Sequence, residues 1–122
     1  MYVCIIIVQK ELREQLHQVV KKNFPNSTHP AFANLTALED VRFKKQLLQV
    51  DLAIVHTADA SRNLGIYISR IQSTTGCGKV LLMRRPNESM ELHESSCGVV
   101  TLVEPLNESL LAVKVGYVLA LP

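Results

Sequence analysis

His56 is the residue whose type and place in this chain best suit chemistry. It ends an apolar segment, Asp-Leu-Ala-Ile-Val-His at 51–56, whose composition is typical of a buried strand. In an open sheet covered by helices, the carboxyl ends of the strands border the crevice where ligands bind. An imidazole there can transfer protons or change its charge near neutral pH. The sequence therefore points first to a crevice that contains His56.

The other reactive residues lack the spacing that a catalytic or metal site needs. The run Gly-Cys-Gly-Lys at 76–79 has too few glycines for a phosphate-binding loop, and we expect a strand rather than a helix after it. Cys4, Cys77 and Cys97 form no paired ligand motif for zinc. His93 lies near Cys97, but that segment offers no complete catalytic constellation. We therefore expect no enzyme activity, no metal site and no cofactor.

The composition fits a single domain spanning residues 1–122. Hydrophobic residues make up 48% of the chain, and no stretch approaches the roughly 20 apolar residues of a membrane span. The apolar start at 3–8 lacks a basic leader and a cleavage site, so we expect a strand and not a signal peptide. The net charge is +2, without the basic stripe or aromatic platforms of a nucleic-acid binder. We expect a cytoplasmic protein without direct contact to nucleic acid or membrane.

Short apolar runs alternate with segments of helical spacing along the whole chain. The runs predict strands over residues 3–8, 31–35, 51–55, 79–83 and 99–103. Helices are predicted over 12–24 and 36–48, from a cap at Asp59 or Ser61 to the glycines at 76–78, weakly over 87–96, and after a cap at Asn107. Thr36 and Glu39 would form the capping box of the second helix. Alternating units of this length imply an α/β fold with a five-stranded parallel sheet between two helix layers.

Three local patterns resemble the receiver domain of bacterial response regulators. They are Val-Asp-Leu-Ala-Ile-Val-His at 50–56, Asn-Leu-Gly at 63–65 and Val-Glu-Pro at 103–105, and the order of the expected elements matches over essentially the whole chain. The resemblance implies a doubly wound, flavodoxin-like sheet with strand order 2-1-3-4-5. It also implies a role in two-component signal transduction and transcription regulation, with the chain as the N-terminal domain of a longer regulator.

The resemblance also identifies where a working receiver keeps its phosphorylation chemistry. Such a domain has an acidic pair after the first strand, an Asp ending the third, a Thr or Ser ending the fourth, and a Lys before a Pro after the fifth. The corresponding positions here hold Gln9, Lys10, His56, Met83 or Arg84, and Glu104. Magnesium prefers anionic oxygen ligands, and a cation rather than a carboxylate holds a phosphoryl group. We interpret the chain as a degenerate receiver, a pseudo-receiver without its phosphorylation pocket.

His56 then has two interpretations. One is a phosphate-accepting or pH-sensing imidazole, since a neighbouring carboxylate at Glu104 would favour its charged form. The other is a polar side chain that hydrogen-bonds Glu104 or Lys10 and fills the vacant pocket. We favour the second, because no general base or metal site accompanies the histidine.

The last predicted helix carries the clearest positive signal for function. Its residues 108–121 include only two charges, Glu108 and Lys114. At about 100° per residue, one apolar stripe should face the sheet, formed by Leu111, Val115, Val118 and Leu119. A second stripe lies on a different side and consists of Leu110, Val113, Tyr117 and Leu121. Because one small domain cannot cover both stripes, we expect the second, together with Lys114, to bind a second copy of the chain or another protein.

The leading hypothesis is therefore a phosphorylation-independent regulatory module that acts through protein interaction or dimerisation. The alternative is a small-molecule or anion sensor, in which the crevice near Gln9, His56 and Arg84 holds an anion or a nucleotide. The charges of Lys10 and of the pair Arg84 and Arg85 favour this alternative.

Overall fold

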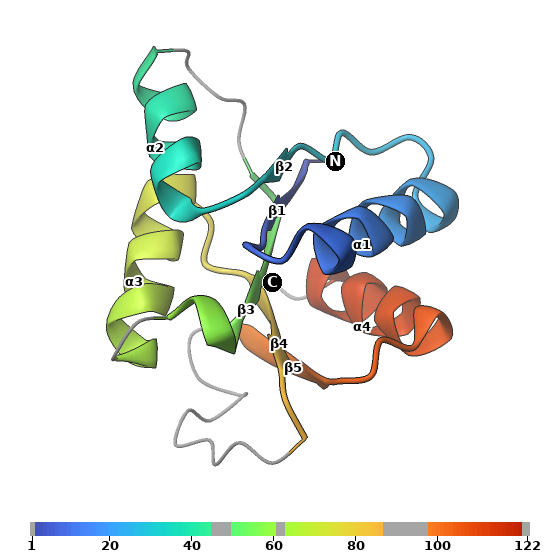
Figure 1. Cartoon of the computed structure of the whole chain (residues 1–122). Coiled ribbons are helices and arrows are strands. Elements are labelled where there is room, and N and C mark those ends of the chain that lie inside the picture. Colours follow the sequence, from blue (N-terminus) through green and yellow to red (C-terminus); the bar gives the residue numbers. More distant parts are fainter. Residues whose placement is uncertain (1, 45–49, 61–62, 87–97, 121–122) are drawn as a thin grey trace.

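The computed structural model describes residues 2–44, 50–60, 63–86 and 98–120. Within them, β1 (Val3–Ile6), β2 (Ala31–Phe32), β3 (Leu52–His56), β4 (Val80–Arg84) and β5 (Val99–Val103) form one sheet. All neighbouring strands are parallel, in the order β2-β1-β3-β4-β5, so the predicted fold class and strand order are confirmed. The helices are α1 (Lys10–Asn23), α2 (Leu35–Lys44), α3 (Leu64–Thr75) and α4 (Glu108–Ala120), and a 3-10 helix, η1 (Thr57–Asp59), follows β3. Figure 1 shows the sheet as the middle layer, with α1 and α4 on one face and α2 and α3 on the other.

Each strand supplies side chains to both faces of the sheet, because successive residues point in opposite directions. The core on the side of α1 and α4 includes Ile5, Leu16, Ile54, Met83 and Val115. The core on the side of α2 and α3 includes Cys4, Leu38, Val55, Ile71 and Leu82. β3 lies at the centre of the sheet and is buried over its whole length, which explains its continuous apolar sequence. Its central position brings His56 to the middle of the carboxyl edge.

Asparagine side chains cap the starts of α2, α3 and α4. The Oδ1 atoms of Asn34, Asn63 and Asn107 each accept a hydrogen bond from the backbone N–H three residues later, at 2.8, 3.0 and 2.9 Å. These bonds satisfy N–H groups that have no partner within the helix. The predicted cap at Asn107 is confirmed.

Two capping predictions are wrong. Thr36 lies inside α2, and Glu39 forms an ion pair with Arg70 at 2.8 Å, so neither takes part in a capping box. Asp59 lies in η1 before the start of α3, and its carboxylate accepts a hydrogen bond from Val8 N–H at 3.1 Å. In both places a nearby asparagine provides the cap instead, Asn34 for α2 and Asn63 for α3.

The observed element bounds differ from the predicted ones by a few residues. β1 ends at Ile6 and β2 has only two residues, whereas α1 begins two residues earlier than expected, at Lys10. Gly76 follows α3 with a φ of 70°, the left-handed conformation that favours glycine, so the predicted break there is confirmed. Ser61, the end of the second predicted helix at 45–48 and the weak helix at 87–96 lie outside the described residues.

Candidate functional site

His56 ends β3 and is 5% exposed at the carboxyl edge of the sheet. Its Nε2 lies 2.8 Å from Oε1 of Glu104. Its Nδ1 accepts a hydrogen bond from the N–H of Ala58, in η1, at 2.9 Å. Both ring nitrogens are therefore engaged, and the imidazole is fixed between the loop after β3 and the loop after β5.

The two hydrogen bonds determine which ring nitrogen carries the proton. Nδ1 must keep its lone pair to accept from Ala58, so the proton is on Nε2 and is donated to the Glu104 carboxylate. A second proton on Nδ1 would face the N–H of Ala58. A phosphoryl group would need one of the two nitrogens with a free lone pair and access to solvent. Of the two interpretations, this geometry favours the polar side chain that fills the pocket, and its partner is Glu104 rather than Lys10.

The backbone holds Glu104 beside the end of β3. Its N–H donates to the carbonyl oxygen of Arg84 at 2.8 Å, which extends the pairing of β4 and β5 by one residue. A cis peptide bond joins Glu104 to Pro105. The carboxylate is thus directed at His56, and its negative charge is opposite to the charge that would hold a phosphoryl group.

The loop after β1 is held by two residues that the sequence patterns did not identify. Asp59 accepts the hydrogen bond from Val8 N–H, and Arg13 donates from Nη1 to the carbonyl oxygens of Ile7 and Val8, at 2.8 and 3.2 Å. Nothing in the local sequence distinguishes these side chains from ordinary surface charges. Their hydrogen bonds hold the backbone of the loop that precedes α1.

Gln9 and Lys10, which follow this loop, are both exposed. Gln9 occupies the N-cap position of α1, but its side chain makes no capping hydrogen bond. Among the described residues, no ion pair joins the Lys10 ammonium to a carboxylate. Lys10 is therefore not the partner of His56, whereas Gln9 lines a hollow that Glu104 also lines.

Of the two residues at the end of β4, Met83 packs into the core and Arg84 lies half-buried at the edge. Met83 pairs with His56 in the register of β3 and β4, and its side chain is fully buried on the side of α1 and α4. It contributes packing where a working receiver would have a hydroxyl group. Arg84 contributes its backbone carbonyl to Glu104.

A hollow of about 420 Å³ lies at the carboxyl edge. It is lined by Gln9, Glu11, Leu12, Gln15, Pro86, Glu104, Pro105 and Leu106. Three residues predicted for an anion site, His56, Lys10 and Arg84, do not line it. The charged groups that do are carboxylates, so the lining suits a cationic or neutral ligand better than an anion.

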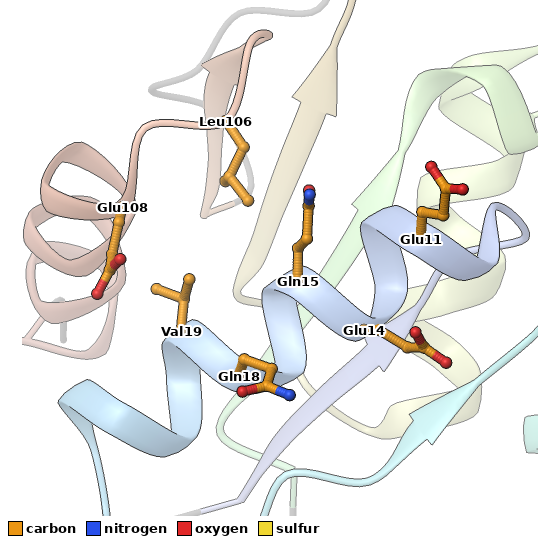
Figure 2. A pocket seen from close by; sticks show the side chains of 7 residues that line it. All are labelled: Glu11, Glu14, Gln15, Gln18, Val19, Leu106 and Glu108. Atoms are coloured by element: carbon orange, nitrogen blue, oxygen red, sulfur yellow. The ribbon is translucent and has the colours of Figure 1, made fainter.

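A second hollow, of about 600 Å³, continues from the first along α1 toward the start of α4. Figure 2 shows the side chains that line it: Glu11, Glu14, Gln15, Gln18 and Val19 from α1, with Leu106 and Glu108 opposite. Lys22 and Glu108 form an ion pair at 3.0 Å between α1 and α4. Both side chains are exposed, so this pair adds little stability.

The described cysteines are buried away from both hollows. Burial raises the pKa of the Cys4 thiol to about 12, and it also raises the pKa of the Cys77 thiol. A thiol with a raised pKa is a poor nucleophile near neutral pH. Within the described ranges, no three His, Cys, Asp or Glu side chains are grouped so that they could hold a metal ion. None of the helices described is long and apolar enough to cross a membrane.

The inner face of α4 packs on the sheet as its spacing predicted. Leu111, Val115 and Val118 are buried, and Leu119 is partly buried against the same core. This stripe, with α1, covers one face of the sheet.

The outer face of α4 exposes three large apolar side chains. Leu110, Val113 and Tyr117 are 43%, 67% and 60% exposed. The fourth residue predicted for this stripe, Leu121, lies outside the described residues. We call Leu110, Val113 and Tyr117 the outer face of α4; its use as an interface remains a prediction.

Lys114 does not extend outward from this face as a binding residue would. Its ammonium donates a hydrogen bond to the backbone carbonyl oxygen of Thr101 in β5. β5 is an edge strand, so this bond occupies one of the backbone groups with which an added strand would pair. The ammonium thus protects the sheet edge, and the part of Lys114 in an interface stays a prediction.

Comparison with solved structures gives the same architecture. A response regulator receiver protein from Burkholderia phymatum matches with a TM-score of 0.75 at 15% identity, over 99% of this chain and 96% of that one. A two-component response regulator from Clostridium difficile matches at 0.74 and 19% identity, over 98% and 95%. The signal receiver domain of a DNA-binding response regulator from Colwellia psychrerythraea 34H matches at 0.70 and 19% identity, over 96% of each chain. The sequence matches no protein-family model and none of the curated proteins compared with it.

The protein has the receiver-domain fold. Within this receiver fold, the predicted pocket residues all come from the carboxyl ends of β1, β3, β4 and β5. They do not form one polar site, since His56 bonds Glu104, Met83 is in the core, and Gln9 and Lys10 are exposed. The receiver fold thus positions the pocket, and the side chains present fill it.

Proposed function

We propose that this receiver-like chain is a signalling module that works without phosphorylation and acts by binding protein through the outer face of α4. The observation that carries the proposal is the 2.8 Å hydrogen bond between His56 and Glu104. It places a neutral imidazole and a carboxylate where phosphoryl transfer would need a free acceptor and a cation. The regulatory signal would then be carried by association instead of a phosphoryl group.

The chemistry around the carboxyl edge supports phosphorylation independence. A phosphoacceptor site of this type needs anionic oxygen ligands for Mg²⁺. At the positions of the acidic pair, Gln9 is neutral and Lys10 is cationic, and Asp59, from η1, accepts a hydrogen bond from Val8 N–H. Neither position of the pair therefore supplies an anionic ligand to a metal ion.

The shape of α4 supports protein association. Leu110, Val113 and Tyr117 lie within two helical turns on one side of the helix, and their exposure is unusual for large apolar residues. Because Lys114 occupies the carbonyl of Thr101, a partner would pack against helix side chains and not pair with β5 as an added strand. The partner is a second copy of the chain or another protein with an apolar surface.

Light scattering with matched variants tests the association. We expect self-association of the chain in the micromolar range and its loss in Tyr117→Asp. Ile66→Asp is the control, because Ile66 is 61% exposed on α3, in the opposite helix layer. A chain that stays monomeric and captures no partner through this face, or that responds equally to both substitutions, would contradict the proposal.

Incubation with acetyl phosphate and Mg²⁺ tests phosphorylation independence separately. We expect no phosphoryl adduct by intact mass spectrometry and no change in self-association. An adduct that disappears in His56→Gln would instead identify His56 as a phosphate acceptor. The prediction that the chain is the N-terminal domain of a longer transcription regulator stays a prediction.

A ligand sensor is the second candidate, supported by the hollow at the carboxyl edge. Because Glu11 and Glu104 line it, a small amine is the ligand class that its charge favours. A thermal-shift comparison of small amines with phosphates and nucleotides would decide. Stabilisation by an amine that is lost in Glu11→Gln would support a sensor, and no stabilisation by any compound would exclude it.

A further inference from the structure

Two histidines that take no part in the proposed function contact each other beside the sheet. The ring centres of His17 and His29 lie 4.6 Å apart, and the ring planes are inclined by 55°. His17 belongs to α1 and His29 to the segment between α1 and β2. Both are half-buried, so the contact ties this connecting segment to the helix.

The segment around His29 closes the edge of β1. The carbonyl oxygens of Thr28 and Pro30, on either side of His29, accept hydrogen bonds from Val3 N–H at 2.8 Å and Ile5 N–H at 3.0 Å. β2 itself contributes only two residues to the sheet. The backbone groups of β1 on this side therefore depend on residues 28–32 for their partners.

The charges on α1 oppose protonation of His17. Arg13 and Lys21 each lie one turn away, and Glu14 is the carboxylate on the adjacent turns. Arg13 directs its guanidinium to the carbonyl groups after β1. Burial first, then the His29 ring and then Lys21, lower the pKa of His17 below its ordinary value.

The connecting segment adds no charge of its own near the two rings. Nδ1 of His29 lies 3.1 Å from the carbonyl oxygen of Ser27, to which it can donate, and 3.4 Å from Oγ of the same residue. From β2, Ala31 lines the adjoining hollow with Arg13, Glu14, His17 and Gln18. Glu14 is therefore the one anionic group in that lining, and its carboxylate would stabilise a protonated His17.

We propose that the contact between His17 and His29 is an acid-sensitive latch that holds the connecting segment against the edge of β1. Two neutral imidazoles pack together, whereas two imidazolium rings at this separation repel each other. Lys21 adds to the repulsion and Glu14 offsets part of it. Opening of the latch frees the N–H groups of Val3 and Ile5, which leaves a sheet edge able to pair with another strand.

The direction of the pH effect follows from the lowered pKa of His17. The open state, in which His17 regains its ordinary pKa near 6.5, binds protons more readily than the closed state. The latch is therefore fully stable above about pH 6.5 and weakens as the pH falls through the range below it.

Amide hydrogen exchange of the whole chain, measured by NMR and corrected for intrinsic rates, tests the latch. Between about pH 7.5 and pH 5.5 we expect the protection of the Val3 and Ile5 amides to fall, by up to about tenfold for each unit of pKa difference. The Val80 amide, which bonds the Gly98 carbonyl at 3.1 Å between β4 and β5, should not follow this change.

Matched variants separate the latch from general acid instability. His17→Gln and His29→Asn should abolish the pH dependence at Val3 and Ile5, and Lys21→Gln should reduce it. Lys10→Gln, at the start of the same helix, should leave it unchanged. Protection that is independent of pH in the unsubstituted chain, or that falls equally in His17→Gln, would overturn the proposal.

Discussion

The carboxyl edge around His56 and the outer face of α4 are the two places where function was expected, and they differ in how their groups are satisfied. At the edge, both nitrogens of a 5% exposed imidazole have hydrogen-bond partners. On α4, Leu110, Val113 and Tyr117 remain in contact with water. A satisfied polar group stabilises the fold, whereas exposed apolar groups gain free energy when a partner covers them. The difference is the reason why we propose stability as the role of the edge and recognition as the role of the helix.

The largest effect is expected when an aspartate replaces His56 at the end of β3. His56→Asp places a carboxylate in a buried site that faces Glu104, and the like charges cannot both be stabilised there. We expect a loss of about 3 kcal/mol in the free energy of unfolding at pH 7, measured by urea denaturation. The double variant His56→Asp with Glu104→Lys should recover part of the loss. Unchanged stability of the single variant would show that the pocket tolerates an acidic side chain.

A smaller effect is expected where Lys114 protects the sheet edge. Lys114→Met keeps the apolar stem but removes the bond to the Thr101 carbonyl, so we expect a loss of about 1 kcal/mol and more aggregation. Lys22→Met is the control, because its exposed ion pair with Glu108 should contribute less than about 0.5 kcal/mol. Equal losses in the two variants would mean that the edge needs no such protection.

The helix caps provide a prediction in which two neighbouring substitutions have opposite signs. Asn34→Ala removes the cap of α2 and should cost about 1 kcal/mol. Thr36→Ala, inside the helix, should instead stabilise by a few tenths of a kcal/mol, because alanine is the better helix former. Thermal or urea unfolding of both variants would check this. A larger loss in the free energy of unfolding for Thr36→Ala than for Asn34→Ala would mean that Thr36 does cap the helix.

Several features of this fold could be predicted from the sequence. β3 and the inner face of α4 were predictable, because a continuous apolar run and a helical period record burial directly in the residue order. Glu104 was correctly expected beside His56, since the ends of parallel strands meet at one edge. These features depend on local sequence or on topology alone.

Two of the interactions that escaped prediction join residues that are not close in the chain. Asp59 bonds Val8 across 51 positions and so does not serve as a helix cap. Lys114 donates a hydrogen bond to the Thr101 carbonyl oxygen, a contact that the sequence patterns did not predict. A charged side chain has the same sequence pattern whether it is solvated or caps a distant backbone group, so only the tertiary structure distinguishes these roles.

On the outer face of α4, a substitution should change the stability of the monomer very little. Val113→Gln should leave the free energy of unfolding of the monomer within about 0.5 kcal/mol, because the side chain is 67% exposed and glutamine is a good helix former. Val115→Ala, two residues later on the buried face, should cost about 2 kcal/mol. If Val113→Gln also weakens self-association in light scattering, then one helix carries two separable functions: its buried stripe stabilises the receiver fold, and its exposed stripe binds the partner. A monomer destabilised by Val113→Gln would mean instead that this stripe already packs within the domain, and that recognition lies elsewhere.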